Sequence, residues 1–188
     1  MALTHLHPGL QKRALPLSVK AWHEMIAKGL VSKRAELIRG VIIEKMSKSI
    51  SHAKLSSRLL KTLIKALSDH FWVRSETPLT LIDSEPEPDL SVVAGAEETH
   101  RGHPRTAKLV IEVSVTTLAE DRDMIEIYAE AGVEEFWIVD AEHRCVEVHR
   151  QPVDGHYMIS EVRAAGQVLD CVALPGVRVD VSELFAGI

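Results

Sequence analysis

Membrane-length apolar runs and aromatic residues are both scarce in this chain. No apolar stretch approaches the roughly 20 residues that a membrane-spanning helix needs. The N-terminus lacks the apolar core and cleavage site of a secretory signal, so we expect a cytoplasmic protein with no membrane partner. Aromatic residues make up only 4% of the chain, which leaves few stacking platforms for single-stranded nucleic acid.

The cysteine and histidine patterns that hold disulfides or zinc are also missing. The two cysteines, Cys145 and Cys171, are far apart and lack CxxC spacing, so we expect two reduced thiols. None of the ten histidines belongs to an HxxxH or HExxH pattern, and the usual sequence signatures of a zinc site are therefore absent.

The length and composition suit one sizeable hydrophobic core. The chain has 188 residues and 46% hydrophobic content, which is enough for a single domain. Pro8, Gly9 and Pro16 break regular structure near the N-terminus. We expect a loose leader over residues 1–16 and one domain over residues 17–188.

The net charge of −5 hides a strong asymmetry along the chain. Residues 1–65 hold 13 lysines and arginines against three glutamates, a net charge of +10, and residues 66–188 have a net charge of −15. A basic surface from the first third would favour a polyanionic partner. An equally plain interpretation is that the basic segment docks on the acidic remainder of the same chain.

Two carboxylates interrupt apolar runs that are typical of short buried strands. Asp89 opens the run that ends at Val93, and Glu112 lies between Leu109 and Val113. An unpaired buried charge is very unfavourable, so each carboxylate needs a cation or a shifted pKa. A shared divalent metal would satisfy both. Alternatively, each one ends its strand at the solvent edge or pairs with an arginine.

Helices and hairpins are indicated around these two runs. We expect a helix from Ser18 to near Gly29, and then a hairpin that turns at Arg39-Gly40. A helix with a leucine stripe follows, and its basic face, Lys54 to Lys65, is either solvated or in contact with nucleic acid. Residues 71–73 and 77–82 are predicted to be extended.

A strand–helix–strand unit is predicted after the second carboxylate. Thr117 and Glu120 have capping-box spacing at the start of a helix that stops at Gly132, and the strand 136–139 follows. Such a unit makes its two strands parallel neighbours with a right-handed crossover. Residues 145–149 and 157–160 predict a hairpin, and residues 175–181 a short edge segment before a final helical turn.

Six segments of the chain follow one another in a recognisable order, namely Glu36-Leu37-Ile38-x-Gly40, Ser51-His52, Pro88-Asp89-Leu90-Ser91-Val92-Val93, Leu109-Val110-Ile111-Glu112-Val113-Ser114, Asp121-Arg122, and Tyr128 to Val139. Their order resembles the Uma family of putative restriction endonucleases in the PD-(D/E)xK nuclease superfamily. The resemblance covers the chain from about residue 15 onwards. It implies an α/β (α+β) fold, a restriction-endonuclease-like mixed sheet flanked by helices.

The resemblance also implies a metal site. Asp89 and Glu112 would bind Mg²⁺ or Mn²⁺, and the backbone carbonyl of Val113 would supply a third oxygen. Hard cations prefer such oxygen ligands, and Mg²⁺ keeps several waters. Glu36 matches a family glutamate that would complete the acidic cluster. His52 stands where the family often has a histidine, with a capping or packing role as the alternative.

One position departs from the family pattern. The superfamily has a lysine two residues after the second acid, where this chain has Ser114, and the family's alternative lysine is missing from the helix that follows. Arg122 is the nearest cation in sequence, and it would stabilise developing charge or pair with Asp121 or Glu126 on its own helix. Lysines elsewhere are further candidates, namely Lys45, Lys48 and Lys108.

The expected function is metal-dependent hydrolysis of DNA phosphodiester bonds. The alternatives are a nuclease fold without hydrolysis that serves as a binding or assembly module, and a hydrolase of another phosphate ester. Duplex DNA is the expected nucleic acid, because stacking residues are few. We expect a homodimer, since the C-terminal hairpin offers an edge for strand pairing.

Overall fold

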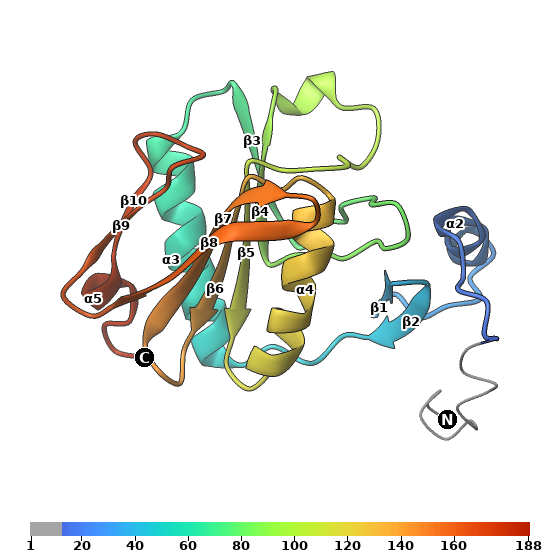
Figure 1. Cartoon of the computed structure of the whole chain (residues 1–188), viewed down its shortest axis with the longest axis horizontal. Coiled ribbons are helices and arrows are strands. Elements are labelled where there is room, and N and C mark those ends of the chain that lie inside the picture. Colours follow the sequence, from blue (N-terminus) through green and yellow to red (C-terminus); the bar gives the residue numbers. More distant parts are fainter. Residues whose placement is uncertain (1–12) are drawn as a thin grey trace.

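A six-stranded mixed sheet forms the centre of the protein in a computed structural model that describes residues 13–188 (Figure 1). Most of the predicted leader, residues 1–12, lies outside the described residues. In spatial order the strands are β3 (Phe71–Ser75), β4 (Leu90–Ala94), β5 (Leu109–Ser114), β6 (Glu135–Asp140), β7 (Cys145–Val153) and β8 (His156–Ala164). Only β5 and β6 are parallel, as predicted, and α4 (Leu118–Glu130) connects them.

Helices cover both faces of this sheet. On one face, α3 (Ile50–Ala66) buries Leu55, Leu59 and Leu63 against the inward side chains of the strands. The short helix α5 (Val181–Leu184) and a two-stranded sheet of β9 (Val168–Asp170) and β10 (Arg178–Asp180) complete that layer. On the other face, α4 buries Tyr128 against a second cluster that includes Phe136. The expected mixed sheet flanked by helices is therefore confirmed.

The first part of the described chain projects to one side of the sheet (Figure 1). We call residues 13–48 the N-terminal arm. It consists of α2 (Val19–Ala27) and the hairpin of β1 (Ala35–Ile38) and β2 (Val41–Glu44), which pack around the buried Trp22. The predicted turn is confirmed, because Arg39 and Gly40 both have positive φ, 51° and 73°.

Two local predictions are wrong. Residues 77–82 form no strand of the sheet, because Pro78 cannot donate a ladder hydrogen bond and Leu79 N donates instead to Pro86 O at 2.9 Å. The capping box at Thr117 does not form either. The Thr117 hydroxyl donates to Asp121 Oδ2 at 2.8 Å rather than capping the helix.

The structure also bears on the expected thiols and membrane contact. Cys145 and Cys171 are both free thiols, as predicted, and Cys171 is buried. Among residues 13–188, no helix combines the length and apolar character needed to cross a bilayer.

The inward face of α3 should carry much of the stability of the domain. Leu59 is 1% exposed, so Leu59→Ala removes buried methyl groups and should lower the free energy of unfolding by about 2–5 kcal/mol. Lys61→Ala, on the exposed face of the same helix, is the control and should change it by less than about 0.5 kcal/mol. Urea unfolding followed by circular dichroism measures both, and equal losses would contradict this arrangement.

Candidate active site

Asp89 and Glu112 lie side by side at the end of the β4–β5 pair. The ladder ends where Leu90 pairs with Ile111, so the next two residues along it are these carboxylates. The backbone N–H of Asp89 donates to Glu112 Oε2 at 3.1 Å, and the N–H of Val113 donates to Asp89 Oδ2 at 2.7 Å. The two acids that the sequence singled out are therefore neighbours.

Asp89 is charged because two basic side chains contact it. Lys48 Nζ lies 2.6 Å from Oδ1, and His52 Nε2 lies 2.8 Å from Oδ2. Burial alone would raise the pKa of Asp89, which is 6% exposed, but the hydrogen bonds from His52 and Lys48 outweigh burial and hold the pKa below its ordinary value. His52 is therefore a hydrogen-bond partner of Asp89 as well as a buried residue in the first turn of α3.

Glu112 lacks any such cation. The Tyr128 hydroxyl donates to Glu112 Oε1 at 2.8 Å, and the Asp89 N–H is its other donor. Burial raises the pKa of Glu112 well above its usual range, and the nearby negative charges of Asp89 and Asp121 raise it further. Glu112 therefore keeps its proton to higher pH than an ordinary glutamate.

Two more carboxylates add negative charge to this cluster. Burial raises the pKa of Asp121, although hydrogen bonds with Thr117 and Ser114 oppose the shift. Burial also raises the pKa of Glu36 on β1 to about 7, against the attraction of Lys45. The charge of Glu36 also contributes to the raised pKa of Glu112, and the place that the resemblance gives Glu36 in a metal site stays a prediction. Asp121 was missed as a site residue, and its position in the Asp-Arg segment was the signal available.

The cation that contacts Asp89 is Lys48, one of the three candidate lysines, and not Arg122. Arg122 is exposed and pairs with Glu147 on β7, and its other contacts do not reach Asp89 or Glu112. It pairs with neither helix neighbour suggested by the sequence. Lys108 pairs with Glu134 instead. Lys48, which immediately precedes the N-cap of α3, supplies the ammonium group.

The donor set fits a hard cation that keeps part of its water shell. Within residues 13–188, no three carboxylate, imidazole or thiol groups converge as a ready-made metal cage. Asp89 and Glu112 supply two carboxylates. The backbone N–H and C=O of an extended residue point toward the same neighbouring strand. Because the Val113 N–H faces Asp89, the Val113 carbonyl lies on that side of β5 as well. Two carboxylates and a carbonyl suit Mg²⁺ or Mn²⁺.

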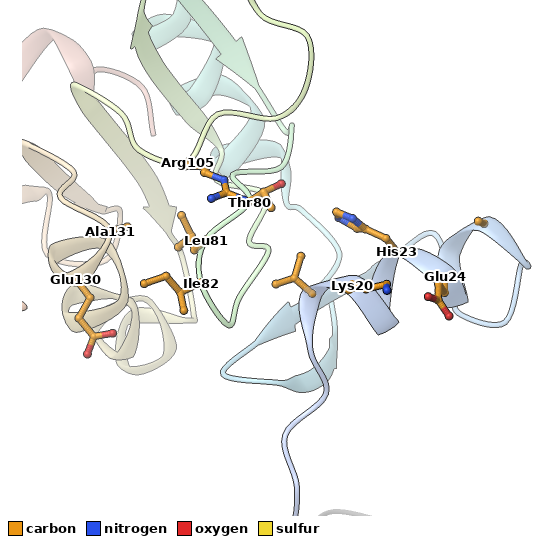
Figure 2. Close-up of a pocket in the computed structure, with 11 residues that line it drawn as sticks. Lys20, His23, Glu24, Thr80, Leu81, Ile82, Arg105, Glu130 and Ala131 are labelled. Carbon is orange, nitrogen blue, oxygen red and sulfur yellow. The ribbon is translucent and has the colours of Figure 1, made fainter.

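A separate cavity of about 820 Å³ lies between α2 of the N-terminal arm, residues 80–82 and the end of α4. Figure 2 shows Lys20, His23 and Glu24 on α2 on one side and Leu81 and Ile82 on the other. None of the four clustered carboxylates lines it. The cavity is therefore distinct from the acidic cluster.

Comparison with known proteins agrees with this geometry. The sequence profile of Uma2, described as a putative restriction endonuclease family, matches residues 30–182. The chain belongs to the Uma2 family. Its fold is similar to the crystal structure of a putative nuclease belonging to DUF820 from Anabaena variabilis ATCC 29413. That match has a TM-score of 0.77 and 16% identity over 91% of this chain and 98% of the other. No curated protein matches the chain.

The Uma2 profile and the structural match together indicate a nuclease-like fold. Both Asp89 and Glu112 lie within the matched range, as does Lys48. The matched range also includes β1, which carries Glu36, and α4, which carries Asp121. All members of the acidic cluster thus belong to the part of the chain that resembles the family.

The raised pKa of Glu36 predicts a pH-dependent loss of stability. A folded-state pKa of about 7, above the ordinary 4.5, means that the folded protein binds this proton more tightly than the unfolded chain. Stability should therefore fall as pH rises from about 4.5 to 7. Glu36→Gln removes this titration, so its stability relative to wild type should rise over that range and level off above it.

Urea unfolding of both proteins in EDTA, at pH values from 4.5 to 8.5, measures this difference. Glu134→Gln is the control, because Glu134 is an exposed residue outside the cluster. A difference between Glu36→Gln and wild type that stays constant with pH would show that Glu36 titrates normally.

Proposed function

We propose that the protein is a metal-dependent endonuclease that hydrolyses DNA phosphodiester bonds with Mg²⁺ or Mn²⁺. The observation that carries the proposal is the contact between the buried Asp89, directly before β4, and the half-buried Glu112 on β5, with further negative charge around them. Such a pair is costly without a cation. Membership of the Uma2 family supports the same reaction class.

The metal would be held by the carboxylates of Asp89 and Glu112 and by the carbonyl of Val113. When bound, a hard dication polarises a phosphoryl oxygen and lowers the pKa of a coordinated water. Glu112 would lose its proton as the cation enters, because a nearby positive charge favours the carboxylate. Tyr128 and His52 are positioning residues that orient Glu112 and Asp89 through their hydrogen bonds.

Lys48 would stabilise the negative charge that develops on the phosphate. Burial would lower the pKa of Lys48, but its hydrogen bonds to Asp89 and to Glu76 at 2.8 Å outweigh burial and raise it. The ammonium group therefore stays charged and acts as an electrostatic group rather than a base. In this role Lys48 would replace the lysine that the sequence lacks near Ser114.

A second candidate function is nucleic-acid binding without hydrolysis. It is favoured by the engagement of both Asp89 oxygens, since Lys48, His52 and the Val113 N–H all donate to that carboxylate. A carboxylate whose charge is already balanced has less need of a metal. The expected homodimer, the duplex substrate and the cytoplasmic location stay predictions.

Removing either acid should abolish cleavage. Asp89→Ala and Glu112→Gln should each reduce Mn²⁺-dependent nicking of plasmid DNA by at least about 100-fold, because each removes a proposed metal ligand. Asp170→Ala, at an exposed ion pair with Arg178, is the matched control and should cleave like wild type. Circular dichroism checks that the variants fold.

Equal cleavage by wild type and Asp89→Ala would contradict the proposed reaction. Binding of DNA by wild-type protein with no cleavage in Mg²⁺ or Mn²⁺ would favour the second candidate.

The role of Lys48 can be distinguished from that of the metal ligands by substitutions that remove or keep its positive charge. Lys48→Met should reduce turnover by about 100-fold or more. It should also leave Mn²⁺ affinity unchanged or tighter, since it removes a positive charge beside Asp89. Lys48→Arg keeps the charge and should retain part of the activity. Calorimetric Mn²⁺ titration and cleavage assays measure the two effects, and full turnover by Lys48→Met would rule out this role.

A further inference from the structure

The basic residues of α3 lie on a single exposed face. Their spacings of four, three and four residues place them on one side of the helix, opposite the buried side chains of the same helix. The exposed ones are Lys54, Lys61 and Lys65, which we call the lysine stripe. Arg58 lies between them and is fixed differently, because its Nη1 donates to Leu184 O at 2.6 Å.

The lysine stripe has no counter-charge among the described residues. Helix α3 contains no aspartate or glutamate, and no carboxylate of residues 13–188 lies within ion-pair distance of the three lysines. Three other cations of the first third, Arg39, Lys45 and Lys48, pair with acids from the later part of the chain. Positive charge thus stays free on α3 in a protein whose net charge is −5.

The stripe begins next to the candidate active site. His52, in the first turn of α3, hydrogen-bonds Asp89 from the buried side of the helix, and Lys54, two residues further along, starts the stripe on the opposite, exposed side. From Lys54 to Lys65 the helix rises about 16 Å, at roughly 1.5 Å per residue. A nucleic acid held on the stripe would therefore lie along the outer side of the helix whose first turn contacts Asp89.

We propose that the lysine stripe binds the phosphate backbone of duplex DNA and guides it to the acidic cluster. This inference rests on the proposed function and names the surface that holds its substrate. Duplex DNA carries about ten phosphate charges over a 16 Å length, which unpaired lysines can neutralise with release of counterions. The described α3 has no aromatic residue on which an unpaired base could stack, so a duplex suits this face better than a single strand.

The test measures binding separately from hydrolysis. The full chain carrying Asp89→Ala is titrated into a fluorescein-labelled duplex in EDTA, and anisotropy gives the affinity at several salt concentrations. One variant adds K54Q, K61Q and K65Q. A matched control adds K20Q, K28Q and K33Q, which remove the same charge from exposed lysines of the N-terminal arm. Circular dichroism confirms that both triple variants fold.

The stripe variant should bind at least tenfold more weakly at about 0.1 M salt, and its slope of log affinity against log salt should be shallower by about 2.7. The control should keep most of the affinity and slope. Equal losses in the two triple variants would overturn the inference, because they would show a general effect of net charge. No binding by the parent protein, or tighter binding of a matched single strand, would also overturn it.

These outcomes separate the inference from the proposed function. Stripe-dependent duplex binding by Asp89→Ala protein supports the inference even if wild type shows no cleavage, which counts only against hydrolysis. Conversely, if wild type cleaves DNA and the stripe variant cleaves at an unchanged rate under subsaturating DNA, the lysine stripe does not guide the substrate while the hydrolytic proposal stands.

Discussion

The Asp89 carboxylate connects four parts of the chain through hydrogen bonds. It accepts from Lys48 at the end of the N-terminal arm, from His52 on α3 and from the backbone of Val113 on β5, while its own strand β4 lies inside the sheet. These donors hold Asp89 ionised in a buried place. This one charge therefore links the end of the arm, the start of α3 and the end of the β4–β5 ladder.

The charge of Asp89 also determines how its neighbours ionise. Because Asp89 stays negative, it raises the pKa of Glu112 beside it and adds to the shifts of Asp121 and Tyr128. A proton bound to such a buried group removes negative charge that a cation would otherwise have to balance. A divalent ion would stabilise such a site strongly. One ion would offset the repulsion between the two acids and would take the place of the proton on Glu112.

Much of the fold follows from sequence patterns, whereas the cation at the site does not. The β-branched runs, the Arg39-Gly40 turn and the strand–helix–strand unit each have local causes, and all are confirmed. Asp89 and Glu112 were recognisable because a charge inside an apolar run is costly. Lys48 was only one of three lysine candidates, because its contact with Asp89 spans 41 residues and depends on how the arm docks. Local spacing also misplaced the hydroxyl of Thr117, which binds a carboxylate instead of a helix end.

The charge asymmetry of the sequence allowed two interpretations, and the structure shows internal docking for part of the basic segment. The segment before Asp89 holds several cations of the arm, since Asp83 contacts Arg39, Glu87 contacts Lys45 and Glu85 contacts His23 at 2.5 Å. Internal docking therefore uses the acids next to the site to hold the arm in place. These pairs are partly exposed, so salt weakens them more than it weakens the buried contacts of Asp89. Because Lys48 belongs to the same arm, the order of the arm and the charge balance of the acidic cluster are physically linked.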